Sequence, residues 1–200
     1  CGTLDHDIAR TYQAYYHGAF ELDDVELGEQ GLNRLGSVIV PNECYGDILE
    51  KSVLPWLQEI EDERLKMNPE NPWRGFGSIE LCWAFGDRID DESSLLHWAA
   101  KHRIPIVVPG LSDGSVGAQL FMHRQRSPDF IIDFLADEQV LSDLTWTCDE
   151  SHALMVGGGI SKHHVIWWNQ YRDGLDSAVA ITTAPEHDWS LSGARLKEAI

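Results

Sequence analysis

The sequence predicts an α/β protein with a doubly wound, mostly parallel, Rossmann-like sheet and flanking helices. The second half of the 200-residue chain alternates short apolar runs with longer amphipathic segments. The runs are apolar on both faces, which is typical of buried parallel strands joined by crossover helices. No internal repeat or low-complexity linker interrupts the chain, so we expect one continuous domain over residues 1–200.

The same patterns place the expected strands and helices. The strands are the apolar runs IPIVV, DFIIDF, ALMV and AVAIT at residues 104–108, 129–134, 153–156 and 178–182. In the first half, helical periodicity predicts helices at residues 4–16, 45–64, 79–89 and 93–101. Prolines and asparagines predict a loop over residues 68–73.

The formal net charge of −18 indicates which classes of partner the protein is expected to bind. This charge repels phosphate backbones and anionic lipid, which argues against nucleic-acid and membrane-surface roles. No apolar stretch approaches the roughly 18 residues of a membrane span. Cationic small molecules and basic proteins fit better, although a solvated acidic surface explains the same charge. The four cysteines form no Cys-x-x-Cys pair, so we expect buried thiols in a cytoplasmic protein, without a zinc or redox centre.

Both ends of the sequence are expected to be truncated. The chain begins at Cys1 rather than Met, carries no signal-peptide pattern, and ends at Ile200 within a segment of helical character. We therefore expect a partial domain.

Three loops follow expected strands, and in doubly wound sheets ligands bind at the carboxyl ends of strands. The loops are PGLSDGSVG, GGGISKHH and TAPEHDWSLSGAR, at residues 109–117, 157–164 and 183–195. Glycines between a strand and a helix let the backbone approach a pyrophosphate, which gives Gly158 and its neighbours a phosphate-binding role. A glycine-rich tight turn explains them equally well. Asp113 likewise either binds a ribose hydroxyl or caps a helix.

The adjacent His163 and His164 predict no metal site. On a helix they point about 100° apart, whereas two histidines that chelate one metal are usually four residues apart. A single histidine near a ligand cleft is a candidate general base, and a hydrogen-bonded packing histidine is the alternative.

Four motifs together resemble deoxyhypusine synthase, in the branch found in archaea. They are GLNRLGSVIVPNECY, PGLSDGSVG, VGGGISKHH and TTAPEHDWSLSGARLKEA, at residues 31–45, 109–117, 156–164 and 182–199. The resemblance implies the deoxyhypusine synthase fold, NAD as cofactor and a homotetramer. It also implies transfer of the aminobutyl group of spermidine to one lysine of the precursor of the hypusine-bearing translation initiation factor.

The resemblance further implies which residues form the site. The implied NAD contacts are Cys1, Gly2, Asp113, Gly158, Thr183, Ala184, Asp188 and Ser192. The implied polyamine contacts are Asp5, His6, His163, Trp189, Ser190, Leu191 and Glu198, with His163 as the catalytic base. The family's covalent lysine lies in a Ser-Trp-Gly-Lys segment directly after the residues equivalent to 197–200. Lys162 is therefore not that nucleophile, and we expect this chain alone to be inactive.

Three positions depart from the better-known eukaryotic members, which carry aspartates at Ala118 and Leu191 and a glycine at Trp189. One hypothesis is that the donor is agmatine, whose planar guanidinium stacks on Trp189. The alternative places Trp189 in a subunit contact.

The identity of the acceptor also stays open, because a homospermidine-synthase-like enzyme of this type transfers the group to a free diamine. A third possibility is a non-catalytic NAD-binding subunit that pairs with an active paralogue. The 31–45 segment belongs either to a subunit interface or to a buried structural segment.

Overall fold

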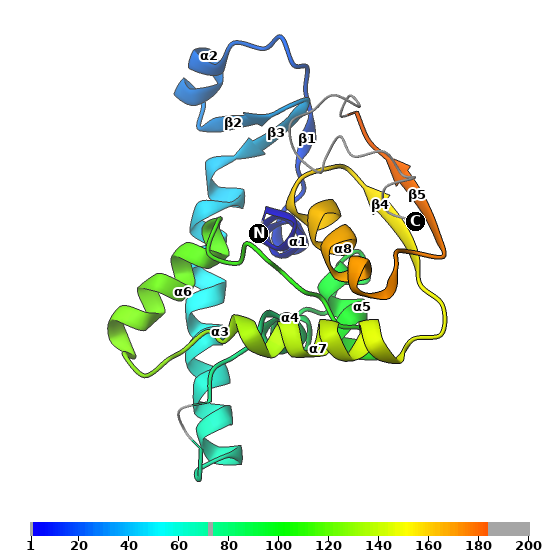
Figure 1. Cartoon of the computed structure of the whole chain (residues 1–200). Helices are drawn as coiled ribbons and strands as arrows, with labels where there is room; N and C mark the ends of the chain where they lie inside the picture. Colours follow the sequence, from blue (N-terminus) through cyan, green and yellow to red (C-terminus); the bar gives the residue numbers. More distant parts are fainter. Residues whose placement is uncertain (1, 72–73, 184–200) are drawn as a thin grey trace. The chain divides into compact units, whose positions relative to one another are not determined.

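The computed structural model describes residues 2–71 and 74–183 (Figure 1). It is a mixed α/β structure that divides into two compact units, Cys1–Asp133 and Phe134–Ile200. The part of the chain that the structure describes contains eight α-helices and two small sheets.

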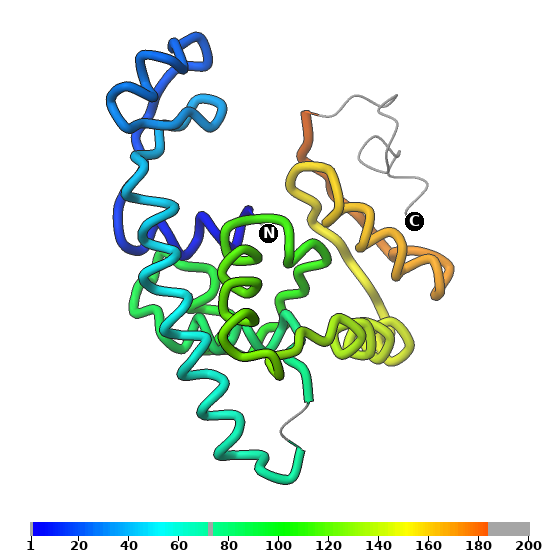
Figure 2. The backbone as a smooth tube through the Cα atoms, turned by 90° about the vertical axis from the view of Figure 1, so that its left-hand side faces the viewer, coloured from blue at the N-terminus to red at the C-terminus, as the bar shows by residue number. Residues whose placement is uncertain are grey.

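The first unit is mainly helical, and one long helix organises its core. Its helices are α1 (Gly2–Tyr12), α2 (Asp24–Glu29), α3 (Gly46–Met67), α4 (Ser78–Gly86), α5 (Leu95–His102) and α6 (Ser115–Arg126). Leu49, Val53, Leu57 and Ile60 recur at helical spacing along α3 and are all buried, so they form one apolar stripe. Figures 1 and 2 show α3 running away from the small antiparallel sheet, with α6 packed against it.

A three-stranded antiparallel sheet lies at the start of α3. Its strands are β1 (Tyr16–His17), β2 (Leu32–Leu35) and β3 (Val38–Pro41), in the order β1-β3-β2. Leu35 pairs with Val38, which leaves a two-residue turn in which Gly36 has φ +64°, as tight hairpins require. The motif at residues 31–45 thus forms a hairpin followed by the short 3-10 helix η1 (Asn42–Cys44).

The second unit contains a parallel β–α–β arrangement. After α7 (Phe134–Thr147), strand β4 (His152–Val156) leads into α8 (Ile160–Asn169). The short 3-10 helix η2 (Gln170–Arg172) and strand β5 (Ser177–Ile181) follow. The two strands are parallel and in register from His152 opposite Ser177 to Val156 opposite Ile181. The expected strands at 153–156 and 178–182, and their parallel pairing through a crossover helix, are confirmed. The expectation that these strands are buried is wrong, because Met155 is the one buried residue of β4 and β5.

The prediction of strands at 104–108 and 129–134 is wrong. Residues 104–108 form no strand in the described structure, because side chains of α4 take up their backbone groups: the Trp83 indole donates to the Ile104 carbonyl, and the Val108 amide donates to the Ser78 hydroxyl. Residues 129–134 contribute a single parallel bridge, between Ile132 and Phe76. A doubly wound sheet is therefore not evident in the described residues.

The four expected helices are present, with shifted ends. The helix expected at 4–16 is α1, which stops at Tyr12 because Tyr16 pairs in the sheet with Ile39. The helices expected at 45–64, 79–89 and 93–101 are α3, α4 and α5. Gly86 ends α4 where it crosses α5, and a Cβ at that position would lie only 2.1 Å from the Leu96 carbonyl oxygen.

Two buried carboxylates on α1 bind the N-termini of two other helices. Asp5 accepts hydrogen bonds from the amides of Ser115 and Val116 at the start of α6, each at 2.8 Å. Asp7 accepts from the amides of Leu95 and Leu96 at the start of α5, at 3.0 and 3.1 Å. A carboxylate at a helix N-terminus meets free amides and the positive end of the helix dipole. Helix α1 thereby fixes where α5 and α6 begin.

Removing the charge of Asp5 is expected to destabilise the first unit. In Asp5→Asn an amide NH₂ faces backbone N–H donors, so a buried hydrogen bond is lost, at a cost of about 2–3 kcal/mol. Asp23→Asn is the matched control, since Asp23 caps the exposed helix α2 and asparagine caps equally well. Urea unfolding followed by circular dichroism measures both variants. Equal losses in the two would contradict the assigned role of Asp5.

Candidate functional site

The two parallel strands of the second unit end at one edge, and the glycine turn lies there. The amide of Gly157, directly after β4, donates to the carbonyl of Ile181 at the end of β5, at 2.7 Å. Thr183 follows β5 by two residues and is exposed. The glycines and Thr183 therefore leave the same edge of the sheet, where ligands bind in α/β proteins.

The glycine turn has the geometry of an anion cradle. Gly157 and Gly159 have φ values of +84° and +75°, and nothing lies within 4 Å of a Cβ placed on either residue. The positive φ values, rather than crowding, are what favours glycine at both positions. Gly159 is the N-cap residue of α8 and Gly158 is exposed, so backbone amides and the helix dipole face this edge. These residues fit the pyrophosphate of a dinucleotide such as NAD.

The two adjacent histidines of α8 have different surroundings. His163 is exposed, and its ring lies parallel to that of Trp167, with the ring centres 6.3 Å apart. His164 is partly buried, with its Nε2 3.4 Å from Glu138 Oε1 on α7. This divergence is the one expected for neighbouring residues on a helix. Among residues 2–71 and 74–183 there is no group of three or more potential metal ligands.

In the first unit, the loop at residues 109–117 leads into α6. Its glycines have structural reasons: Gly114 has φ +151°, and a Cβ on Gly117 would lie 2.4 Å from the Ser112 carbonyl oxygen. Asp113 is exposed just before the helix. Because Asp5 binds the first amides of α6, it also fixes the end of the loop that carries Asp113.

Asp5 and His6 are adjacent in the sequence but have different environments. The Asp5 carboxylate is buried and also accepts a hydrogen bond from the Tyr45 hydroxyl at 2.7 Å. His6 Nδ1 lies 2.8 Å from the hydroxyl of Tyr15, and its ring is 4.9 Å from that of Tyr45. Burial lowers the pKa of His6 below its usual value of 6.5 and raises the pKa of Tyr15 to about 12. Asp5 and His6 therefore combine a hydrogen-bonded carboxylate with an imidazole whose pKa is lowered by burial.

Gly2 is exposed in the first turn of α1, and Lys162 is buried in the first turn of α8. Eight other predicted site residues lie outside the described part of the chain: Cys1, Ala184, Asp188, Trp189, Ser190, Leu191, Ser192 and Glu198. Sequence reasoning missed Asp7, Tyr15, Tyr45 and Trp167. For one of these four residues the sequence contains an indication: Trp167 belongs to a pair of adjacent tryptophans that follows the glycine turn in the sequence.

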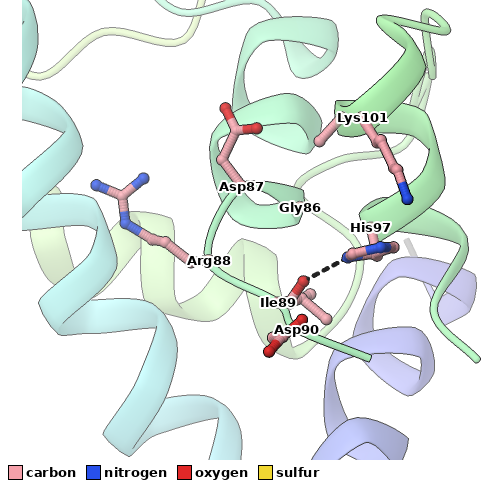
Figure 3. Close-up of a pocket in the computed structure, with 8 residues that line it drawn as sticks. Gly86, Asp87, Arg88, Ile89, Asp90, His97 and Lys101 are labelled. Carbon is pink, nitrogen blue, oxygen red and sulfur yellow. Dashed lines mark hydrogen bonds between the residues drawn. The ribbon is translucent and has the colours of Figure 1, made fainter. Parts of the chain in front are cut away.

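An open pocket of about 430 Å³ lies elsewhere in the first unit (Figure 3). Its lining includes Asp87, Arg88 and His97 and none of the predicted site residues. Its charges are largely engaged: Asp87 pairs with Arg103, and Arg88 pairs with Glu59 and Glu63. The His97 ring is held by the Ile89 carbonyl at 2.7 Å. We do not assign this pocket as the functional site.

None of the helices in the described part of the chain is both long and apolar enough to cross a membrane.

The fold is that of a mixed α/β protein in which a glycine turn follows one of two parallel strands at their carboxyl edge. The family model described as deoxyhypusine synthase matches residues 1–200. The chain belongs to the deoxyhypusine synthase family.

Individual relatives agree with this assignment. Proteins assigned as deoxyhypusine synthases from Picrophilus torridus, Thermoplasma acidophilum and Ignicoccus hospitalis are 53%, 49% and 46% identical to the whole of this chain. The chain spans 61% of the length of each. A crystal structure assigned to a deoxyhypusine synthase from Entamoeba histolytica is similar, with a TM-score of 0.53 and 25% identity, over 72% of this chain and 49% of that one.

The lowered pKa of His6 predicts a pH dependence of stability. Because the pKa of His6 is lowered in the folded protein, the unfolded chain binds a proton more readily once the pH falls below about 6.5. The stability that neutral His6 contributes is present above that pH and is lost as the pH falls. We expect the melting temperature to drop more steeply between about pH 7 and 5 in wild type than in His6→Gln.

Thermal melts by circular dichroism test this expectation. His17→Gln, at an exposed position on β1, is the control and should follow the wild-type curve. Parallel pH profiles for wild type and His6→Gln would show that His6 does not contribute in this way.

Proposed function

We propose that the complete protein is an NAD-dependent transferase of the deoxyhypusine synthase type. It moves the aminobutyl group of spermidine to one lysine of the precursor of the hypusine-bearing translation initiation factor. The observation that carries the proposal is the family match over residues 1–200, which includes the glycine turn at the edge of β4 and β5. By the same resemblance we expect a cytoplasmic homotetramer.

The cofactor is assigned to the loops at the strand and helix ends. Gly158 and the first amides of α8 would hold the pyrophosphate, and Thr183 follows β5 at the same edge. By the resemblance, Gly2 and Asp113 of the first unit are further candidate cofactor contacts, and both residues are exposed. Bound NAD would accept a hydride at the start of the reaction and return it at the end, which makes the transfer redox-neutral.

His163 is assigned as the general base. A hydride leaves the carbon beside an amine readily only when the nitrogen lone pair is free, so a base must first remove a proton from the charged amine. The exposed ring of His163 is accessible for this step, whereas the His164 ring is directed to Glu138. Oxidation gives an imine, and attack of an enzyme lysine on its carbon displaces 1,3-diaminopropane. The acceptor lysine then displaces the enzyme lysine in the same way, and return of the hydride reduces the final imine to the aminobutyl product. By the resemblance, Lys162 is not that nucleophile, since the family's covalent lysine follows the residues equivalent to 197–200.

A second candidate is an enzyme of the same family that uses agmatine or modifies a free diamine. The environment of the α1 residues favours it: the Asp5 carboxylate is engaged at α6, and burial lowers the pKa of His6, which disfavours its charged form. Ala118, where eukaryotic members carry an aspartate, is exposed and uncharged. Fewer carboxylates toward the amine favour a donor with fewer charges than spermidine.

The proposed role of His163 as general base predicts that substitutions of the two adjacent histidines have different effects on amine oxidation. We expect His163→Gln to lower the rate of amine oxidation about 10²- to 10⁴-fold, which is the usual contribution of a general base. His164→Gln, on the next residue of the same helix, should keep a rate close to wild type. Formation of NADH by the complete protein, followed by absorbance, measures both. Similar losses in the two variants would remove His163 from its proposed role.

The transfer itself is tested by intact mass spectrometry of the cognate translation factor. The factor is incubated with the complete protein, NAD and either spermidine or agmatine, and with a control that omits NAD. We expect an added aminobutyl group from spermidine, only when NAD is present. An added guanidinobutyl group would assign agmatine as the donor. An unmodified factor with free polyamine products would contradict protein modification and support the second candidate.

A further inference from the structure

Three aromatic rings form an exposed row that starts at His163. His163, Trp167 and Tyr171 recur every four residues, so they lie along one side of α8 and its continuation in η2. The rings of His163 and Trp167 are nearly parallel, at 11° and 6.3 Å, and those of Trp167 and Tyr171 are perpendicular, at 6.2 Å. We call these three residues the α8 aromatic row.

The row is not part of the hydrophobic core. Trp167 is 47% exposed and Tyr171 is 46% exposed, although both rings are large and apolar. The neighbouring Trp168 differs, because its indole nitrogen is buried. Single exposed apolar residues need no explanation, but a row of rings continuous with a candidate catalytic histidine does.

The chemistry of the row suits a cation. The face of an indole carries negative charge density and attracts ammonium and guanidinium groups. A cation can therefore bind to an aromatic ring without a carboxylate beside it. His164, the histidine adjacent to the row, differs from His163 because it pairs with Glu138. Tyr171 and Trp167 lie perpendicular to each other, and nearly half of the Trp167 side chain remains exposed and accessible to such a group.

We propose that Trp167 is a specificity-determining residue that receives a charged end of the amine donor while His163 faces the amine to be oxidised. This inference rests on the proposed function of His163. An alkylamine donor carries at least two nitrogens separated by a short alkyl chain, and one helical turn separates the two rings. With one nitrogen at His163, the chain of the donor extends along the row and places the next cation over Trp167. The apolar rings also exclude water from the alkyl chain between them.

The test measures spermidine affinity and turnover in the complete protein. Trp167→Leu removes the ring and keeps an apolar side chain, so we expect the Kd and KM for spermidine to rise about 3- to 30-fold, with a smaller change in kcat. Trp167→Phe keeps a π face and should recover much of the affinity. Trp146→Leu on α7 is the matched control, because Trp146 is 68% exposed and lies outside the row. Its Kd and KM should equal those of wild type.

Two readouts separate this inference from the proposed function. Calorimetry reports spermidine binding without turnover, and NADH absorbance reports oxidation. Binding that depends on Trp167 without NADH formation supports the inference and contradicts the proposed function. Oxidation by wild type with unchanged Kd and KM in Trp167→Leu overturns the inference alone. A change in oligomeric mass of Trp167→Leu, with unchanged Kd, also overturns it and assigns the row to a contact between copies. A wild-type protein that binds no spermidine overturns both.

Discussion

The first unit depends on two carboxylates that are buried on one short helix. An isolated buried carboxylate is strongly unfavourable, and it is tolerated only when hydrogen bonds replace the water that it loses. Asp5 and Asp7 meet this condition through backbone amides of α6 and α5, supplemented by the hydroxyls of Tyr45 and Ser94. Each interaction satisfies the carboxylate and the first turn of another helix together. The positions of α5, α6 and the loop before α6 therefore follow from α1.

In the second unit, a pair of parallel strands determines where the loops of the candidate site begin. The register of β4 and β5 brings the residues that follow both strands to one edge, and the positive φ values of Gly157 and Gly159 direct the chain into α8. The cradle of amides thus follows from backbone geometry, while His163 and Trp167 follow from the position of α8. Cofactor and amine chemistry are assigned to residues from the same short stretch of the chain.

Much of the secondary structure could be predicted from the sequence, because local signals determine it. The apolar stripe of α3 has helical spacing, and a glycine turn and a segment of helical character separate the runs that form β4 and β5. The runs at 104–108 and 129–134 are equally apolar, yet apolar composition does not by itself determine strand pairing. The side chains of Trp83 and Ser78 form hydrogen bonds with the backbone of residues 104 and 108, in place of hydrogen bonds to a neighbouring strand. Helix–helix capping by Asp5, across 110 residues of sequence, leaves no local signal.

In the candidate site, too, some features could be predicted from the local sequence and others depend on the tertiary fold. The divergence of His163 and His164 follows from helix geometry and could be predicted, as could the glycine turn. The partners of His6 could not, because Tyr15 and Tyr45 reach it only through the tertiary fold. The row at Trp167 required the structure as well, since sequence alone does not tell which ring of an aromatic doublet faces solvent.

In the proposed function, the glycine turn that follows β4 holds the cofactor. Hydrogen–deuterium exchange of the complete protein, followed by mass spectrometry with and without NAD, tests this most directly. We predict slower exchange on NAD binding in peptides that cover residues 157–161, with no change in the hairpin at residues 32–41. NAD binding that leaves the exchange of the glycine turn unchanged would contradict the proposal.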